Sequence, residues 1–155
     1  EQASPSEPTL EQPPGLEVAQ AHLDRSLQTR GLMVQPYVKS VETRGELSLI
    51  YIDGQFSHAI RKLPALGDYR VQEEYGGNDF PERPSAAALA LGAQLMQAPP
   101  LTRPDGPQLY ARLDLIEGDR GELMLVELEL VEPSLFFRHH PQAAEALADA
   151  LLRRL

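Results

Sequence analysis

The sequence contains no cysteine, is poor in positive charge and has no long hydrophobic run. Without cysteine it has no disulfide, no thiolate metal ligand and no cysteine nucleophile. It carries 14 Lys and Arg against 23 Asp and Glu, for a net charge of -9 at pH 7. Nucleic acids and anionic membranes bind clustered basic residues, so neither is expected as a partner. The longest apolar run, residues 86–91, is far below the roughly 20 residues of a membrane span.

The composition that remains is that of one globular unit with a polar N-terminal segment. The chain has 155 residues, 42% of them hydrophobic, which is enough for one sizeable core. Residues 1–14 contain four prolines and three glutamates and almost no apolar side chain. We therefore expect a disordered linker or cut end over 1–14 and one folded subdomain over 15–155. The sequence opens with Glu1 rather than Met, which favours a piece of a longer protein.

The hydrophobic pattern predicts helices and antiparallel strands. Helical spacing or composition marks residues 16–27, 86–97 and a last segment that opens at His140-Pro141. Strand-like runs cover 32–37, 46–52, 55–61, 108–116 and 123–131. The second and third runs are joined by Asp53-Gly54, a typical two-residue hairpin turn. Residues 63–84 are expected to be irregular. This order predicts an α+β fold: an antiparallel sheet with helices packed on one face.

The last predicted hairpin carries a group of acidic residues. Side chains alternate along a strand, so Glu127 and Glu129 point the same way, about 7 Å apart. A symmetric turn centred near Asp119-Arg120 places Asp114 on that face, close to Glu127. A register slip of one residue would move Asp114 to the opposite face.

Carboxylates that share a face repel one another unless one is protonated or a cation neutralises them. Oxygen ligands without cysteine favour Mg²⁺ or a similar hard ion over Zn²⁺. A solvent-exposed sheet face that carries acids is the alternative, and the spacing alone leaves it open. Lys62 and Arg70 bracket a glycine-containing loop and are candidates for holding phosphate or carboxylate groups, or else are solvated loop charges. For His58, packing or exposure is favoured over catalysis.

Several blocks of the chain, in order, resemble the second subdomain of ATP-grasp ligases. The likeness extends over residues 16–155 and is closest to the glutathione-synthetase-like branch and the cyclo-ligase of cycloserine biosynthesis. It rests on segments similar to the hinge, the central hairpin and the magnesium hairpin of that superfamily: 33–38, 45–54, 56–64, 67–72, 111–114 and 127–134.

The resemblance implies an ATP- and Mg²⁺-dependent ligase, with Mn²⁺ as a substitute ion. In the family, ATP converts a carboxylate into an acyl phosphate, which an amine or similar nucleophile attacks. By position, the metal ligands implied are Asp114, Glu127 and Glu129. Lys62 and Arg70 match catalytic cations that face the phosphates. The nucleotide contacts implied are Glu46 near the ribose and Gln35, Pro36 and Tyr37 at the hinge.

Two departures from the family pattern shape the expectation. Glu129 stands where Asn is common, which adds a negative charge. The family also has an N-terminal substrate domain and a first ATP-grasp subdomain, neither of which is present in the 155 residues. We therefore expect the C-terminal half of a cytoplasmic ligase, inactive alone and able to self-associate. Its partners would be the missing N-terminal portion, ATP, a small carboxylate and an amine-type nucleophile. A non-catalytic binding or assembly module with this fold, or a plain acidic interaction domain, stays open as an alternative.

Overall fold

The computed structural model describes residues 15–99, 101–102 and 104–155. The expected linker over 1–14 lies outside the described residues. The chain divides into two units, Glu1–Tyr37 and Val38–Leu155. The boundary expected at residue 14 stays a prediction.

In the first unit, α1 (Leu16–Leu27) forms as the sequence predicted. The strand predicted over 32–37 is wrong, because these residues have no regular secondary structure. A strand is stabilised by backbone hydrogen bonds to a neighbouring strand. Pro36 also lacks the N–H group that a ladder needs.

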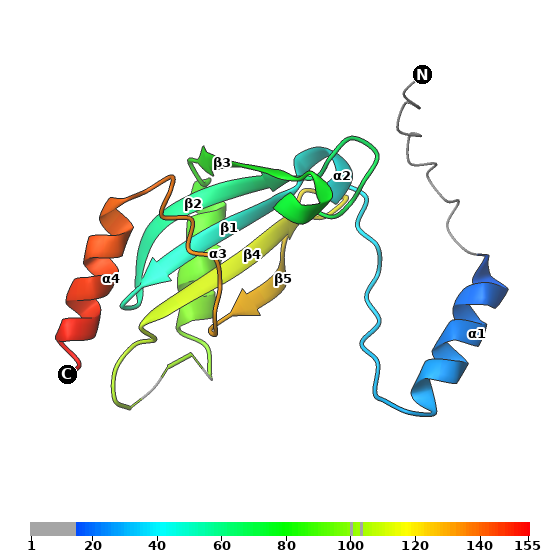
Figure 1. The fold of residues 1–155 in the computed structure, drawn as a ribbon, viewed down its shortest axis with the longest axis horizontal. Coiled ribbons are helices and arrows are strands. Elements are labelled where there is room, and N and C mark those ends of the chain that lie inside the picture. The colour runs from blue at the N-terminus through cyan, green and yellow to red at the C-terminus, as the bar shows by residue number, and fades with distance from the viewer. Residues whose placement is uncertain (1–14, 100, 103) are drawn as a thin grey trace, which may run out of the picture. The chain divides into compact units, whose positions relative to one another are not determined.

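The second unit is built on a five-stranded antiparallel sheet with the strand order β3-β2-β1-β4-β5 (Figure 1). Its strands are β1 (Glu46–Ile52), β2 (Gln55–Leu63), β3 (Asn78–Glu82), β4 (Tyr110–Glu117) and β5 (Leu123–Glu129). The helices are α2 (Val41–Arg44), the 3-10 turn η1 (Glu73–Tyr75), α3 (Ala86–Met96) and α4 (Gln142–Leu152). The α+β class and the antiparallel sheet predicted from the sequence are confirmed.

Local sequence explains how the main elements begin and turn. Asp53 and Gly54 have positive φ angles of 50° and 74°, as a two-residue hairpin turn requires. The hydroxyl of Ser85 accepts a hydrogen bond from the Ala88 N–H at 3.1 Å and so caps α3. In that helix Gly92 lies against β1, where a Cβ would stand 2.3 Å from the Tyr51 hydroxyl. Close packing of α3 on the sheet therefore depends on this glycine.

Each face of the sheet has its own hydrophobic core. On one face, Leu49 and Leu113 pack with Ala88 of α3. On the other face, Ile50 and Ile60 pack with α4 and with the segment around Leu135. Consecutive residues of β1 thus serve opposite cores, as strand alternation requires. The helices lie on both faces, which corrects the prediction that they pack on one.

The structure also contains elements that the sequence pattern did not indicate. β3 falls inside the stretch 63–84 that was expected to be irregular, and it carries Pro81 on the outermost strand. An edge strand tolerates proline because one side of its backbone needs no partner. The last helix begins at Gln142, with Pro141 at the N-cap rather than at the first helical position.

Candidate metal and phosphate site

The pairing of β4 with β5 brings the predicted acids together through an irregularity in the ladder. Near the turn, Leu115 lies opposite Leu125, and that register continued would place Asp114 opposite Val126. The register shifts by one residue between Asp114 and Leu115, so that Asp114 lies opposite Glu127. This β-bulge, not a symmetric turn, places Asp114 and Glu127 on one face.

Asp114, Glu127 and Glu129 each offer a carboxylate oxygen, and these oxygens lie within 4.8 Å of one another. The expected convergence of the three acids is therefore confirmed as geometry, while their role as metal ligands stays a prediction. Asp114 is fully buried, whereas the Glu127 side chain is 55% exposed and that of Glu129 is 25% exposed. The group is therefore buried at one end and open to solvent at the other.

Asp114 is held by three neighbours on the same face of the sheet. The Ser48 hydroxyl donates to its Oδ1 at 2.6 Å, and the Lys62 ammonium donates to its Oδ2 at 2.9 Å. Arg112 adds hydrogen bonds from Nε to both oxygens at 3.1 Å and from Nη2 to Oδ2 at 2.9 Å. A buried carboxylate is stable only when it is paired and hydrogen-bonded in this way.

Lys62 and Arg112 link Asp114 to the other acids. Lys62 lies directly opposite Glu46 in the β1–β2 ladder and contacts its Oε2 at 2.8 Å. Arg112 lies opposite Glu129, donates from Nη2 to its Oε1, and has Glu127 Oε2 at 3.7 Å. We call this set the acid cluster: Glu46, Asp114, Glu127 and Glu129 with Lys62 and Arg112.

Sequence analysis missed Arg112 and Ser48 as members of the site. Arg112 is two residues before Asp114 on one strand, so alternation alone placed both on the same face. Ser48 is recognisable only from the β1–β4 register, in which it lies opposite Asp114.

The charges of the cluster shift the proton affinities of its carboxyl groups. Burial raises the pKa of Asp114. The positive charges of Lys62 and Arg112 lower it by more than burial raises it, so the pKa lies below its ordinary value. Burial together with the charges of Glu129 and Asp114 raises the pKa of Glu127. With all four carboxylates ionised, the two cations leave two negative charges uncompensated. A single divalent cation would neutralise that excess.

The donor set fits a hard divalent cation. All three candidate ligands are carboxylates, two of them reach solvent, and oxygen ligands of this kind suit Mg²⁺ or Mn²⁺. Adjacent ligands of an octahedral Mg²⁺ are about 2.9 Å apart and opposite ones about 4.2 Å, so the carboxylate oxygens, now within 4.8 Å of one another, would draw together around the ion.

The other predicted site residues lie apart from the acid cluster. Arg70, in the loop between β2 and β3, forms a bidentate pair with Asp68, and its guanidinium lies 3.9 Å from the centre of the Tyr75 ring. No contact within the described residues joins it to the acids. Gln35, Pro36 and Tyr37 belong to the first unit, and their role in binding nucleotide stays a prediction.

His58 packs in the interior, as the sequence favoured. Its Nε2 lies 2.9 Å from the Leu135 carbonyl oxygen and its Nδ1 lies 2.9 Å from the Ser57 hydroxyl. The ring stacks on His140 with centroids 4.9 Å apart. Burial lowers the pKa of His58, so the neutral form that joins β2 to the segment before α4 is favoured.

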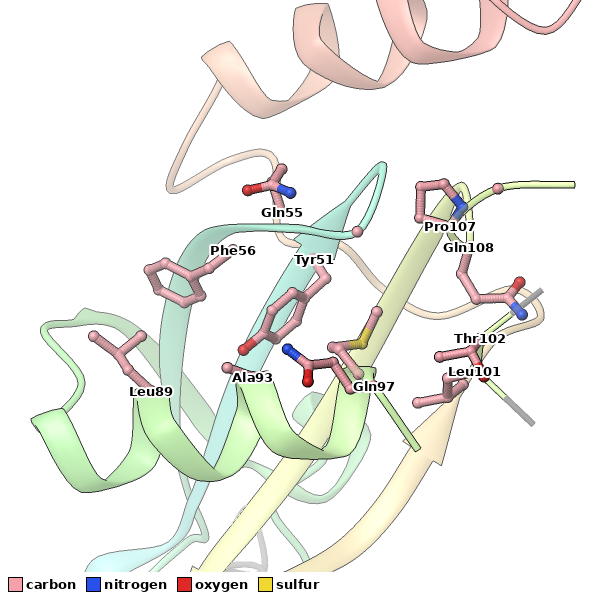
Figure 2. A pocket seen from close by; sticks show the side chains of 13 residues that line it. Tyr51, Gln55, Phe56, Leu89, Ala93, Gln97, Leu101, Thr102, Pro107 and Gln108 are labelled. Carbon is pink, nitrogen blue, oxygen red and sulfur yellow. The ribbon is translucent and has the colours of Figure 1, made fainter. Parts of the chain in front are cut away.

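A cavity on the sheet is a separate feature. A volume of about 750 Å³ lies on the α3 face, beside the tip of the β1–β2 hairpin (Figure 2). Tyr51 points toward α3 in its wall, with Phe56, Leu89 and Met96 around it. None of the predicted site residues lines this cavity.

Comparison with known proteins identifies the class of the chain. No protein-family model matches it. The cycloserine biosynthesis protein DcsG of Streptomyces lavendulae is 36% identical over 151 residues, covering 90% of this chain and 48% of that protein. Glutathione synthetase of Prochlorococcus marinus (strain MIT 9313) is 27% identical over 142 residues, covering 92% and 42%.

Solved structures agree with these sequence relatives. A crystal structure of D-cycloserine synthetase DcsG matches with a TM-score of 0.63 and 29% identity, over 89% of this chain and 48% of that one. D-alanine–D-alanine ligase of Bacillus anthracis, solved with ATP, shares the fold with a TM-score of 0.53 and 16% identity, over 89% and 46%. These relatives are ATP-grasp proteins, and the chain, which is similar to them in sequence and fold, spans about half the length of the curated relatives it matches.

The described residues contain no helix that is long and apolar enough to cross a membrane.

We predict that Asp114→Asn destabilises the fold by about 3 kcal/mol or more, because it leaves Lys62 and Arg112 buried with one counter-charge fewer. Since folding lowers the pKa of Asp114, its contribution is present above the ordinary pKa and is lost as the pH falls through the folded value. Urea unfolding at pH 7 measures the change. Asp119→Asn, in the exposed β4–β5 turn, is the matched control; equal stability of the two variants would contradict this account.

We predict that Glu127→Gln, unlike Asp114→Asn, stabilises the fold. Folding raises the pKa of Glu127, so the folded state binds more protons between the ordinary and the raised pKa, and stability falls as the pH rises through that window. Glutamine does not ionise, so the variant does not lose stability in this way. It should therefore be more stable than wild type at pH values above the raised pKa of Glu127. The difference is at most about 1 kcal/mol, because water screens the exposed side chain. Urea unfolding between pH 3 and 8, with exposed Glu74→Gln as control, tests the sign; a variant less stable than wild type at pH 7 would refute it.

Proposed function

We propose that this chain is the nucleotide- and metal-binding half of an ATP-dependent ligase that joins a carboxylate to an amine-type nucleophile. The observation that carries the proposal is the acid cluster: three carboxylates from two neighbouring strands meet on one face beside two buried cations. Similarity to ATP-grasp proteins supports ATP as the nucleotide. The carboxylate would be activated as an acyl phosphate before the nucleophile attacks it.

The residues have distinct parts in this proposal. Asp114, Glu127 and Glu129 would hold Mg²⁺ or Mn²⁺, which supplies neutralising charge to the phosphates when bound. Lys62 is fixed between Asp114 and Glu46, and its ammonium adds positive charge beside that position. A phosphate binds where such fixed positive charge is already in place, because little further ordering is then required.

The remaining roles follow the family resemblance. Arg70 would leave Asp68 and turn its exposed guanidinium toward the transferred group. Glu46 would meet the ribose, and the hinge residues Gln35, Pro36 and Tyr37 would meet the adenine. The substrate carboxylate and the nucleophile would be bound mainly by the N-terminal portion of the ligase. We propose that the chain alone is inactive and self-associates in the absence of that portion.

One observation favours a second candidate, a non-catalytic module that keeps the fold. The carboxylate of Asp114 already accepts from Ser48, Lys62 and Arg112, as it would in a purely structural ion network. In that case the chain would bind no divalent cation at the cluster. Measuring metal affinity therefore separates the two candidates.

We predict that the chain binds Mn²⁺ in the presence of ATP, and that Glu127→Gln weakens this binding by about tenfold or more. Replacing one of three carboxylates removes both a ligand atom and a negative charge. Isothermal titration of the purified chain measures the affinity, with Glu74→Gln as a control of equal charge change. Equal affinities of wild type and Glu127→Gln would refute the metal site, and absence of any binding would favour the non-catalytic module.

A further inference from the structure

We infer that Arg112 is an exchangeable internal cation of the metal site. Without metal, the guanidinium of Arg112 pairs with the carboxylates of Asp114, Glu127 and Glu129. When a divalent cation binds, Arg112 gives up its contact with Glu129. The inference rests on the proposed function, since it concerns regulation of the same site.

The guanidinium of Arg112 reaches every candidate ligand. Its Nη2 lies 2.9 Å from Asp114 Oδ2, contacts Glu129 Oε1, and lies 3.7 Å from Glu127 Oε2. A positive group already stands where three carboxylates would otherwise repel one another. A metal ion and this nitrogen therefore compete for the same oxygen atoms.

The acceptor capacity of Asp114 makes the competition unavoidable. A carboxylate has about four lone-pair sites for hydrogen bonds. The sites of Asp114 receive Ser48, Lys62 and the Nε and Nη2 groups of Arg112. Direct ligation by Asp114 thus requires that one of these donors yields.

Arg112 is the donor placed to yield. Lys62 is bound on its other side by Glu46 at 2.8 Å, and no contact of its ammonium with Glu127 or Glu129 exists among the described residues. Among the described residues, Arg112 is the cation that contacts both Asp114 and Glu129, and its Nε can remain on Asp114 Oδ1 while Nη2 leaves Asp114 Oδ2 and Glu129. Without metal, Arg112 therefore offsets part of the negative charge of the cluster, and metal affinity is reduced by the exchange.

The test compares metal affinity after one positive charge is removed inside or outside the cluster. We expect Arg112→Gln to bind Mn²⁺ about tenfold more tightly than wild type, because three excess negative charges replace two and the competitor is gone. Arg112→Lys should fall between them. Arg120→Gln, in the exposed β4–β5 turn, should bind as wild type does. The electron paramagnetic resonance signal of free Mn²⁺ reports the affinities without nucleotide or turnover.

Weaker binding by Arg112→Gln than by wild type would overturn the inference, because Arg112 would then position the ligands rather than compete with the metal. Wild-type binding without any gain in the variant would overturn the inference alone and leave the proposed metal site intact. No binding by either protein would overturn both.

A measurement on wild type covers the case in which Arg112→Gln does not fold. The ¹⁵N side-chain resonance of Arg112, assigned with Arg112→Lys, should shift as Mg²⁺ is added. A resonance unchanged when the site is saturated would overturn the exchange.

Discussion

Asp114 has no solvent contact, and its carboxylate fixes the two cations around which the acid cluster is arranged. Charge burial is costly unless the buried group is paired, so the carboxylate of Asp114 depends on the hydrogen bonds that Ser48, Lys62 and Arg112 donate. They come from β1, β2 and β4, so the ion network joins the three central strands. The stability of the second unit and the position of its candidate site therefore depend on the same carboxylate.

The two faces of the sheet have different tasks. One face packs against α3, and Gly92 allows this helix to approach Tyr51. The other is divided along its length between an apolar core under α4 and the acid cluster. Because the cluster is beside a packed core, its strands are held rigidly while the ends of Glu127 and Glu129 remain accessible. Ligand atoms that are accessible on a packed scaffold are what the proposed metal site would require.

Local sequence patterns predicted the central hairpin, the capped helix α3 and the common face of Glu127 and Glu129, because each depends on neighbours in the chain. Asp114 lies on that face for a reason that the sequence analysis did not foresee. A symmetric turn was expected to set the register, whereas a β-bulge between Asp114 and Leu115 does so. The sequence pattern did not predict β3, because an edge strand can lack alternating apolar side chains and can contain proline. Ser48 and the packing of helices on both faces depend on contacts across strands, which spacing along one strand does not encode.

The central claim is that the acid cluster holds a divalent cation together with ATP. A crystal structure of the chain with Mn²⁺ and a non-hydrolysable ATP analogue tests it most directly, because anomalous scattering locates the ion. The account predicts the ion among Asp114, Glu127 and Glu129, with the phosphates beside Lys62 and with Arg112 withdrawn from Glu129. An ion located elsewhere, with the six residues of the cluster still paired only to one another, would contradict it.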